Sequence, residues 1–439
     1  MFIFPSDKEA MSLFGIIQPP THVNEWKRLW PKDDKSDRTM QTQDFPSGSK
    51  FSLGNFLSLR VLRQVRDVDT FDPNEVGLEQ RFIDQANEML KTYKSWETYC
   101  NSFKHGHGRQ QHEGNFFLAR LYQDNATKTD ISQDVSDSVI SSPARNTRLQ
   151  KQIRKEQEQS PSKSKADAKA NKTLPTGSKD TKISLPIRFK NFDEPSETPF
   201  STPFASDDPF ESPDSPAWMQ PSEPIPKSID EQIINTALVI HLNATTEHFN
   251  LPQHWTMHRK KFVAPAFKNG TEEKGYEART DGYLSDEKGA RVRALIEVKA
   301  APRKRKVLNI FMQESAQMAA WILEHPDEPA NLPGRYVYTE HPYFMDKGLT
   351  IPKKSRFLVS QDRDEIYLNF AQYGEKYLAY LRGEQKFDEN DPESFMTIVE
   401  AGPFQTHNLN NMEKLAPILL ALTLRAVEDE TEYLGQKNE

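Results

Sequence analysis

The chain has 439 residues, of which 28% are charged and 36% hydrophobic, with 30 prolines and a formal net charge of −7, so part of it is not expected to be globular. Its single cysteine, Cys100, excludes an internal disulfide framework, and no Cys/His cluster has the spacing of a structural zinc site. No apolar run approaches the roughly 18 residues that cross a bilayer, so we expect an intracellular protein of the nucleus or cytoplasm with no membrane partner.

The sequence of residues 1–126 predicts a small, partly helical N-terminal region of unknown function. Residues 72–73, an Asp-Pro pair, have the preferences of a helix start, and apolar residues then recur at helical spacing over 82–93. A further helix is predicted over 56–65, with a basic side made of Arg60, Arg63 and Arg66.

Residues 127–227 are rich in Ser, Pro, Asp, Lys and Gln. Such a segment cannot bury enough apolar surface to offset its ordering entropy, so we expect a disordered linker. Its Ser-Pro and Thr-Pro steps, such as Ser160-Pro161 and Thr202-Pro203, are candidate phosphorylation sites through which protein partners could bind, although any linker of this composition contains such steps.

Residues 228–428 predict an α/β (α+β) domain. A helix capped by Ser228 is expected through 230–242. The predicted strands are 261–264, 276–281, 291–299, 335–338, 356–360 and 365–370, with a turn at 285–289. The other predicted helices are 307–323, 373–381 and 412–427. The order is α-β-β-β-α-β with additional C-terminal strands and helices, which indicates a sheet with helices packed on it, and residues 429–439 are expected to form a disordered tail.

The strand at 291–299 carries two charges on one face. Because side chains alternate along a strand, Glu297 and Lys299 share a face with Leu295, and the opposite face carries only the apolar side chains of Ala294, Ile296 and Val298. Charged side chains in an otherwise apolar strand are costly unless they pair with each other or with a ligand. This strand is therefore the candidate site for chemistry.

A second carboxylate is expected beside this strand. Asp281 ends the preceding predicted strand, and the turn at 285–289 would fold the two strands into a hairpin that brings Asp281 near Glu297. Two carboxylates, a backbone carbonyl and waters make the oxygen-rich, partly hydrated site that Mg²⁺ prefers. A nearby lysine such as Lys299 could stabilise a metal-generated hydroxide or the charge that develops on a phosphate.

Asp281 followed by Glu297-Val298-Lys299, in an α-β-β-β-α-β order, resembles the PD-(D/E)XK (restriction endonuclease-like) nuclease superfamily, and the region from 228 to about 427 is similar to a set of fungal proteins with this fold. The resemblance implies a restriction endonuclease-like core and metal-dependent hydrolysis of phosphodiester bonds in nucleic acid, DNA rather than RNA. The implied cofactor is Mg²⁺ (or Mn²⁺).

The resemblance also implies roles for single residues. Asp281 and Glu297 would bind the metal together with the main-chain carbonyl of Val298, Lys299 would position the attacking water, and Glu231 would be the assisting acid of the first helix. The sequence departs from the family pattern at Thr280, where the family name has proline.

The helix at 307–323 places Gln313 and Gln317 four residues apart and therefore on one face. Many members of the superfamily have a glutamine on this helix near the active site. We therefore assign Gln313 to the catalytic site and Gln317 to nucleic-acid binding as expectations.

A compact basic cluster follows the strand immediately after Pro302. The cluster could form a clamp for the phosphate backbone, a nuclear localisation signal or a solvated loop, and its position between a core strand and a helix favours the clamp or the loop. The predicted nucleic-acid contacts in it are Arg303, Lys304, Arg305 and Lys306.

Three alternatives to a nuclease remain open. Glu297 and Lys299 could form a structural pair at a sheet edge. The domain could keep a nuclease fold without turnover and bind nucleic acid or protein. The chain could also be a scaffold regulated through phosphorylation of its linker.

Overall fold

The computed structural model describes residues 18–30, 39–41, 45–104, 114–127, 230–268, 271–286, 291–325, 337–339, 351–384 and 388–437. The linker expected at 127–227 lies outside these residues except for Thr127, as does Ser228. Asp230 caps the helix instead, because its side chain accepts a hydrogen bond from the amide of Gln232 at 2.9 Å.

The helices and short 3₁₀ turns are α2 (Val23–Leu29), η1 (Gly48–Lys50), α3 (Leu53–Ser58), η2 (Pro73–Val76), α4 (Gln80–Lys91), α5 (Lys94–Ser102), α6 (Asn115–Thr127), α8 (Glu231–Thr246), η4 (Glu247–Phe249), η5 (Arg303–Arg305), α9 (Val307–Glu324), α11 (Glu375–Leu381), η6 (Pro392–Ser394) and α12 (Leu409–Lys437). The strands are β1 (Val61–Arg66), β2 (Gln253–Thr256), β3 (Lys261–Lys268), β4 (Thr271–Arg279), β5 (Gly282–Asp286), β6 (Val292–Lys299), β7 (Val337–Thr339), β8 (Ile351–Asp362), β9 (Glu365–Tyr373) and β10 (Met396–Gln405).

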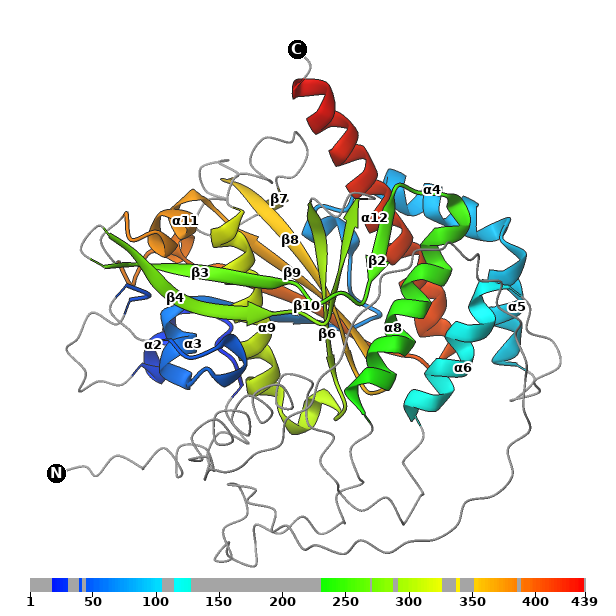
Figure 1. The fold of residues 1–439 in the computed structure, drawn as a ribbon, viewed down its shortest axis with the longest axis horizontal. Helices are drawn as coiled ribbons and strands as arrows, with labels where there is room; N and C mark the ends of the chain where they lie inside the picture. Colours follow the sequence, from blue (N-terminus) through cyan, green and yellow to red (C-terminus); the bar gives the residue numbers. More distant parts are fainter. Residues whose placement is uncertain are drawn as a thin grey trace, which may run out of the picture. The chain divides into compact units, whose positions relative to one another are not determined.

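A mixed sheet forms the centre of the molecule, with helices on both faces, which confirms the predicted α/β class (Figure 1). Its strand order is β1-β10-β9-β8-β6-β5-β2, and β7 pairs with β8 beside this path. The pairs β1–β10 and β6–β8 are parallel and the others along the path are antiparallel. Strands β3 and β4 form a separate two-stranded sheet that packs on α9.

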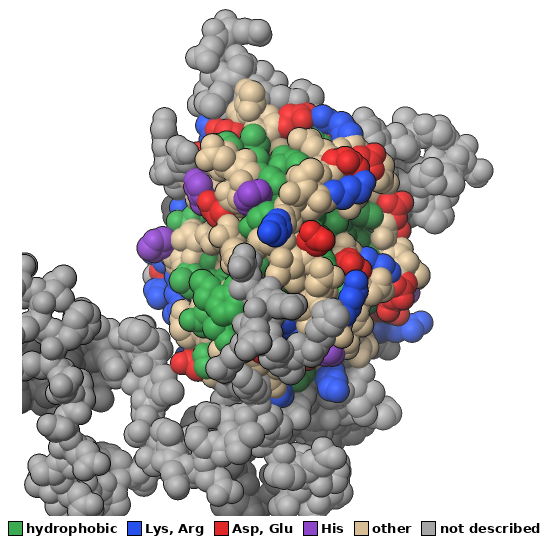
Figure 2. All heavy atoms as spheres, turned by 90° about the vertical axis from the view of Figure 1, so that its right-hand side faces the viewer, with side chains coloured by type: hydrophobic (Ala, Val, Ile, Leu, Met, Phe, Trp, Pro, Cys, Tyr) green, Lys and Arg blue, Asp and Glu red, His purple; other side chains and the backbone are tan. Residues whose placement is uncertain are grey.

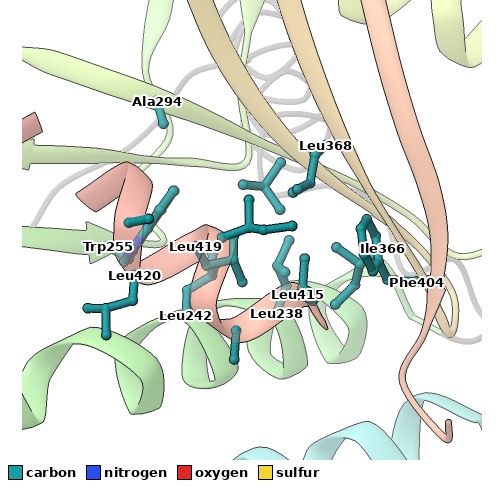
Figure 3. Close-up of a cluster of buried hydrophobic side chains, with 14 of the residues drawn as sticks. Leu238, Leu242, Trp255, Ala294, Ile366, Leu368, Phe404, Leu415, Leu419 and Leu420 are labelled. Atoms are coloured by element: carbon teal, nitrogen blue, oxygen red, sulfur yellow. The ribbon is translucent and has the colours of Figure 1, made fainter. Parts of the chain in front are cut away.

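The two faces of the sheet bury two apolar clusters. On one face α8 and α12 pack against the strands, where Leu238 and Leu242 meet Leu415 and Leu419 (Figure 3). On the other face the cluster is formed by α9, α3, α11 and the β3–β4 hairpin. The sheet therefore has no broad solvent-exposed face, as expected for a sheet that contains parallel strand pairs.

The segment 56–65 is not the predicted helix. Helix α3 ends at Ser58, Arg60 takes a left-handed conformation with φ of 54°, and Val61 begins a strand that pairs with β10. A non-glycine residue in this conformation interrupts a helix. Arg60 is buried among aromatic rings, with its guanidinium carbon 4.3 Å from the ring centroid of Phe395. The predicted basic helix face therefore does not exist.

The N-terminal region shares its core with the second half of the chain, so residues 1–126 and 228–428 are not separate regions. Residues 1–130 and 226–439 fall into one compact unit, in which β1 is an edge strand of the main sheet. Helix α4 packs on α12 and α6 packs on α8. Figure 2 shows the outer surface of this helical side, where apolar side chains lie among charged ones.

Several predicted elements are confirmed and others need correction. The structure contains the expected strands 261–264, 291–299, 356–360 and 365–370 and the helices over 307–323 and 412–427. The segment 276–281 does not form a hairpin with 291–299, since β4 pairs with β3 and a further strand, β5, pairs with β6. The turn expected at 285–289 begins inside β5 and continues outside the described residues. Strands β2 and β10 were not predicted.

The C-terminal residues 429–437 are helical rather than disordered, because α12 continues to Lys437. No glycine or proline interrupts the helix between residue 418 and residue 434. None of the helices within the described ranges combines the length and apolarity that a membrane crossing requires.

Candidate functional site

Strand β6 places its charges as its alternation predicts. Leu295 belongs to the apolar cluster on the α9 face, whereas Ala294, Ile296 and Val298 belong to the cluster on the α8 and α12 face. Glu297 and Lys299 therefore point toward the α9 face. The site is formed where this face changes from apolar to polar along the strand.

Asp281 reaches β6 from the connection between β4 and β5. Its amide donates to the carbonyl of Ile296 at 3.0 Å, and its Oδ2 accepts from the amide of Val298 at 3.2 Å. Asn235 of α8 holds the Asp281 carbonyl through Nδ2 at 3.0 Å. The first helix, this connection and the central strand thus fix one carboxylate beside Glu297.

The close approach at this point depends on the next residue, Gly282. A Cβ on Gly282 would lie 2.3 Å from the Thr256 carbonyl oxygen of β2, which is closer than real Cβ atoms come. Only glycine therefore allows β5 to lie between β2 and β6 immediately after Asp281.

Glu297 is held by three side-chain donors and is 1% exposed. Lys299 Nζ donates to its Oε1, Gln313 Nε2 donates to the same oxygen at 2.5 Å, and Gln317 Nε2 donates to Oε2 at 2.5 Å. Gln317 also donates to the carbonyl of Arg279 at 2.7 Å. The structure therefore brings both predicted glutamines to the carboxylate.

This arrangement changes the role expected for Gln317. Its side chain is 1% exposed and its amide nitrogen is used by Glu297 and by the β4 backbone, so it is not presented to a nucleic acid. Burying Gln317 against the carboxylate satisfies polar groups that would otherwise lie unpaired in the core. The predicted role of Gln317 as a nucleic-acid contact is therefore wrong, and its side chain positions Glu297 instead.

The electrostatics of the pair favour a proton-rich state. Burial raises the pKa of Glu297 to about 8, Lys299 opposes this rise, and the charge of Asp281 adds to it. Burial by itself lowers the pKa of Lys299, but the carboxylates of Glu297, Glu231 and Asp281 leave it above its ordinary value. The negative charges around Lys299 thus stabilise its ammonium.

The remaining two predicted ligands, Val298 and Glu231, lie at the edges of this arrangement. The carbonyl of Val298 accepts from Lys299 Nζ at 3.0 Å. Glu231 is the exposed first residue of α8, and its charge acts on Lys299. The Lys299 ammonium therefore lies between the two groups, Glu297 and the Val298 carbonyl, that the sequence assigned to a metal.

The donor set suits a hard divalent cation in chemistry, because it consists of carboxylate and carbonyl oxygens. Within the described ranges, however, no group of three or more His, Cys, Asp or Glu side chains is arranged to hold a metal ion. Asp281, Glu297 and the Val298 carbonyl could hold one if Lys299 moved away from Glu297. Mg²⁺ commonly keeps several waters and needs few protein ligands, so this set is sufficient for it.

Arg303 is not part of a phosphate clamp. The side chain is 2% exposed and donates to Asp362 Oδ2 at 2.6 Å, to Glu314 Oε1 at 2.5 Å and to Glu400 Oε2 at 2.7 Å. Arg63 also donates to Glu400, at 3.1 Å through Nε. These three carboxylates balance the buried guanidinium, and they come from three segments of the chain, α9, β8 and β10.

The other three residues of the predicted basic cluster differ in what the structure describes of them. Lys304 and Lys306 are exposed, and the side chain of Arg305 lies outside the described residues. Two of the four predicted nucleic-acid contacts therefore remain available on the surface that follows β6.

The buried acids around Arg303 were missed by sequence reasoning. Burial raises the pKa of Asp362 to about 7 despite the opposing charge of Arg303, and burial also acts on Glu400, whose pKa the two arginines nevertheless hold below its ordinary value. One signal was present, because Glu400 lies within the apolar run Ile398-Val399-Glu400-Ala401.

Searches against protein-family models, curated proteins and solved structures find no match to this chain.

Proposed function

We propose that the protein is a metal-dependent phosphodiesterase that hydrolyses nucleic acid, with DNA as the expected substrate. The observation that carries the proposal is the convergence of Asp281, Glu297 and Lys299 at the end of β6. Asp281 comes from the β4–β5 connection and the other two residues from β6, and a buried cluster of charged groups is costly to the fold unless its members pair with each other or serve a ligand.

The arrangement of elements supports the same proposal. The elements α8, β2, β5, β6, α9 and β8 follow one another in the order α-β-β-β-α-β, with the β3–β4 hairpin inserted after β2. Strand β6 is antiparallel to β5 and parallel to β8 across α9. This order is the one expected for a restriction endonuclease-like core.

In this proposal Asp281, Glu297 and the Val298 carbonyl would hold Mg²⁺ or Mn²⁺. When bound, such an ion polarises the phosphate and supplies a hydroxide nucleophile at neutral pH. Lys299 donates to a negatively charged oxygen near the reacting phosphorus. Gln313 and Gln317 keep the Glu297 carboxylate oriented by donating to its two oxygens.

The exposed Lys304 and Lys306 would contact the backbone of the nucleic acid. They follow β6 directly, so a substrate whose scissile phosphate lies at Glu297 would pass close to them. Contacts of this kind add affinity without reading sequence. Their number is small, which agrees with the overall charge of −7.

One observation favours a second candidate, a nuclease-fold module that binds nucleic acid or protein without turnover. Both oxygens of Glu297 already accept hydrogen bonds, and its side chain is almost fully buried. A carboxylate held in this way by three donors can be structural. The two candidates differ in whether the chain turns over substrate.

The deciding experiment measures cleavage of labelled single-stranded and double-stranded DNA and RNA by the full chain, with Mg²⁺, with Mn²⁺ and with a chelator. Glu297→Gln and Lys299→Met should each lower the rate by at least about 100-fold, as expected when a group that stabilises developing charge is removed.

A matched pair of control variants is available in α4. Glu88 and Lys91 form an exposed ion pair whose side chains are 71% and 66% exposed, so Glu88→Gln and Lys91→Met change the same charges without touching the site. Metal-dependent product that survives only in the controls supports the phosphodiesterase. Binding of nucleic acid in chelator with no product from any folded protein would transfer the proposal to the binding module.

A further inference from the structure

Strands β6 and β8 separate at one end of the sheet. They pair only over Leu295–Lys299 and Leu358–Asp362, although β6 begins at Val292 and β8 begins at Ile351. Ahead of the paired part, β6 is paired with β5 and β8 with β9, each on its outer side. The two strands therefore form a fork with a gap between residues 292–294 and 355–357.

A cavity of about 70 Å³ occupies this fork. Its lining comes from the two strands, from Trp321 of α9, from residues 422–429 of α12 and from Val76, Leu284 and Phe370. The fork lies at residues 292–294 of β6, whereas the candidate site uses residues 297–299, so at the rise of a strand the two are roughly 10 to 20 Å apart. The cavity is therefore distinct from the candidate active site.

Arg356 brings a positive charge to this cavity without a counter-charge among the described residues. Its side chain is 4% exposed and donates to Tyr373 Oη at 3.2 Å, to the Trp321 carbonyl at 3.0 Å and to the His325 carbonyl, all uncharged acceptors. No described carboxylate lies within ion-pair distance of it. Two of these acceptors end α9, so the partial negative charge of the helix C-terminus balances part of the charge of Arg356, and no described carboxylate balances the rest.

Trp321 brings an unused hydrogen-bond donor to the same place. Its ring lies beneath Arg356, with the guanidinium carbon 4.3 Å from the ring centroid, and its buried Nε1 has no partner among the described residues. An indole N–H can only donate, so it requires an acceptor. Buried donors without an acceptor are rare in folded proteins.

Other lining residues agree with an anionic occupant. Ser355, Arg293 and Arg425 also line the cavity. Glu430 neutralises Arg293, and the lining also contains one carboxylate, Asp429. Three arginines and one carboxylate thus line the cavity, which favours negative charge there.

We propose that this cavity binds a small oxyanion, a phosphate or carboxylate group, between Trp321, Ser355 and Arg356. The volume of about 70 Å³ is large enough for a single such group. The anion would accept from the indole of Trp321 and neutralise Arg356. It would thereby join α9 to strand β8 beneath α12.

The proposal is tested by calorimetric titration of the full chain with inorganic phosphate, sulfate and acetate in turn. Binding of phosphate and sulfate alone would identify a tetrahedral oxyanion, and binding of acetate would identify a carboxylate. Trp321→Phe keeps an aromatic ring beside Arg356 but removes the donor. It should weaken binding by roughly 10- to 100-fold, the effect of losing one hydrogen bond to a charged group.

Trp255→Phe is the matched control. The indole nitrogen of Trp255 is likewise buried and has no partner in the described part of the chain, but this residue lies in the core of the α8 and α12 face (Figure 3) and does not line the cavity. Its replacement should leave the affinity unchanged. Lys299→Met should also bind normally, which separates this cavity from the candidate active site.

Ser355→Ala provides a second variant should Trp321→Phe fail to fold, and it should weaken binding in the same direction. The proposal is overturned if none of the three anions binds the folded protein at about 10 mM. It is also overturned if the Trp321 and Trp255 variants bind equally well, or if Lys299→Met abolishes binding.

Discussion

The protein should lose stability in mild acid, and replacing His241 with leucine should make this loss smaller. His241 lies on α8 with 0% exposure, packed near the rings of Tyr99 and Phe116. Neither ring nitrogen has a hydrogen-bond partner among the described residues. Burial therefore lowers the pKa of His241 to about 4.

The magnitude follows from the difference between the folded and unfolded chain. An unfolded histidine has a pKa of about 6.5, so below that pH the unfolded chain binds a proton that the native protein does not accept. Stability contributed by neutral His241 is complete above about pH 6.5 and is lost as the pH falls toward about 4. At about pH 5 this loss amounts to about 2 kcal/mol.

The assay is urea unfolding of the wild type and of His241→Leu at about pH 7.5 and about pH 5. Leucine is similar in size and cannot take up a proton, so the difference in unfolding free energy between variant and wild type should grow by about 2 kcal/mol at the lower pH. His258→Leu, at an exposed position, is the control and should follow the wild type. If the wild type and His241→Leu lose stability in parallel, His241 is not a buried neutral group and the packing argument is refuted.

Three further predictions concern the polar groups around β6. Arg303→Met should lower the unfolding free energy by about 3–5 kcal/mol because three carboxylates lose a buried partner, whereas the neighbouring Lys304→Met should change it by less than about 0.5 kcal/mol in the same urea assay. Native Glu297 keeps its proton up to about pH 8, so it contributes a fall in stability as the pH rises from about 4.5 to about 8. Glu297→Gln should therefore make the thermal unfolding midpoint depend less on pH over that range. Equal pH dependence of the midpoint in the wild type and the variant would contradict the raised pKa. Gln317→Leu leaves Glu297 Oε2 and the Arg279 carbonyl without this donor and should cost about 1–3 kcal/mol, while Gln80→Leu, which removes an exposed hydrogen bond to Asp84, should be close to neutral.

The parts of the fold that the sequence predicts well depend on local patterns. The alternation in β6 assigned each side chain to the correct face, because the direction of a strand side chain is decided by its immediate neighbours. The apolar spacing in α8 and α9 likewise predicted both helices. The sequence predicted that Asp281 lies beside β6, and it does. The predicted cause was wrong, because the strand that pairs with β6 is β5 and not β4.

Strand β10 shows why distant pairing escapes such patterns. It lies between β1 and β9, so residues 61–66 and 396–401 pair although more than 300 residues separate them in the chain. Its sequence contains Gly402-Pro403, which is typical of a turn. The structure accommodates these residues in an irregularity of the β10–β9 register between Ala401 and Phe404. Residues 61–66 and β10 therefore form paired strands, although the local sequence favours a helix in the first segment and a turn in the second.

The basic cluster after β6 shows the same limit for charged residues, and it also connects the buried network to the candidate site. Arg303 and Lys304 are equivalent in the sequence, yet the first is buried because its partners Glu314, Asp362 and Glu400 arrive from later segments. Glu314 lies next to Gln313 on α9, so the ion pair with Arg303 fixes the part of α9 that presents its glutamines to Glu297. A buried charge cluster is weak evidence for stability but a means of fixing register. The network around Arg303 is therefore best understood as the support that holds α9 against the end of β6.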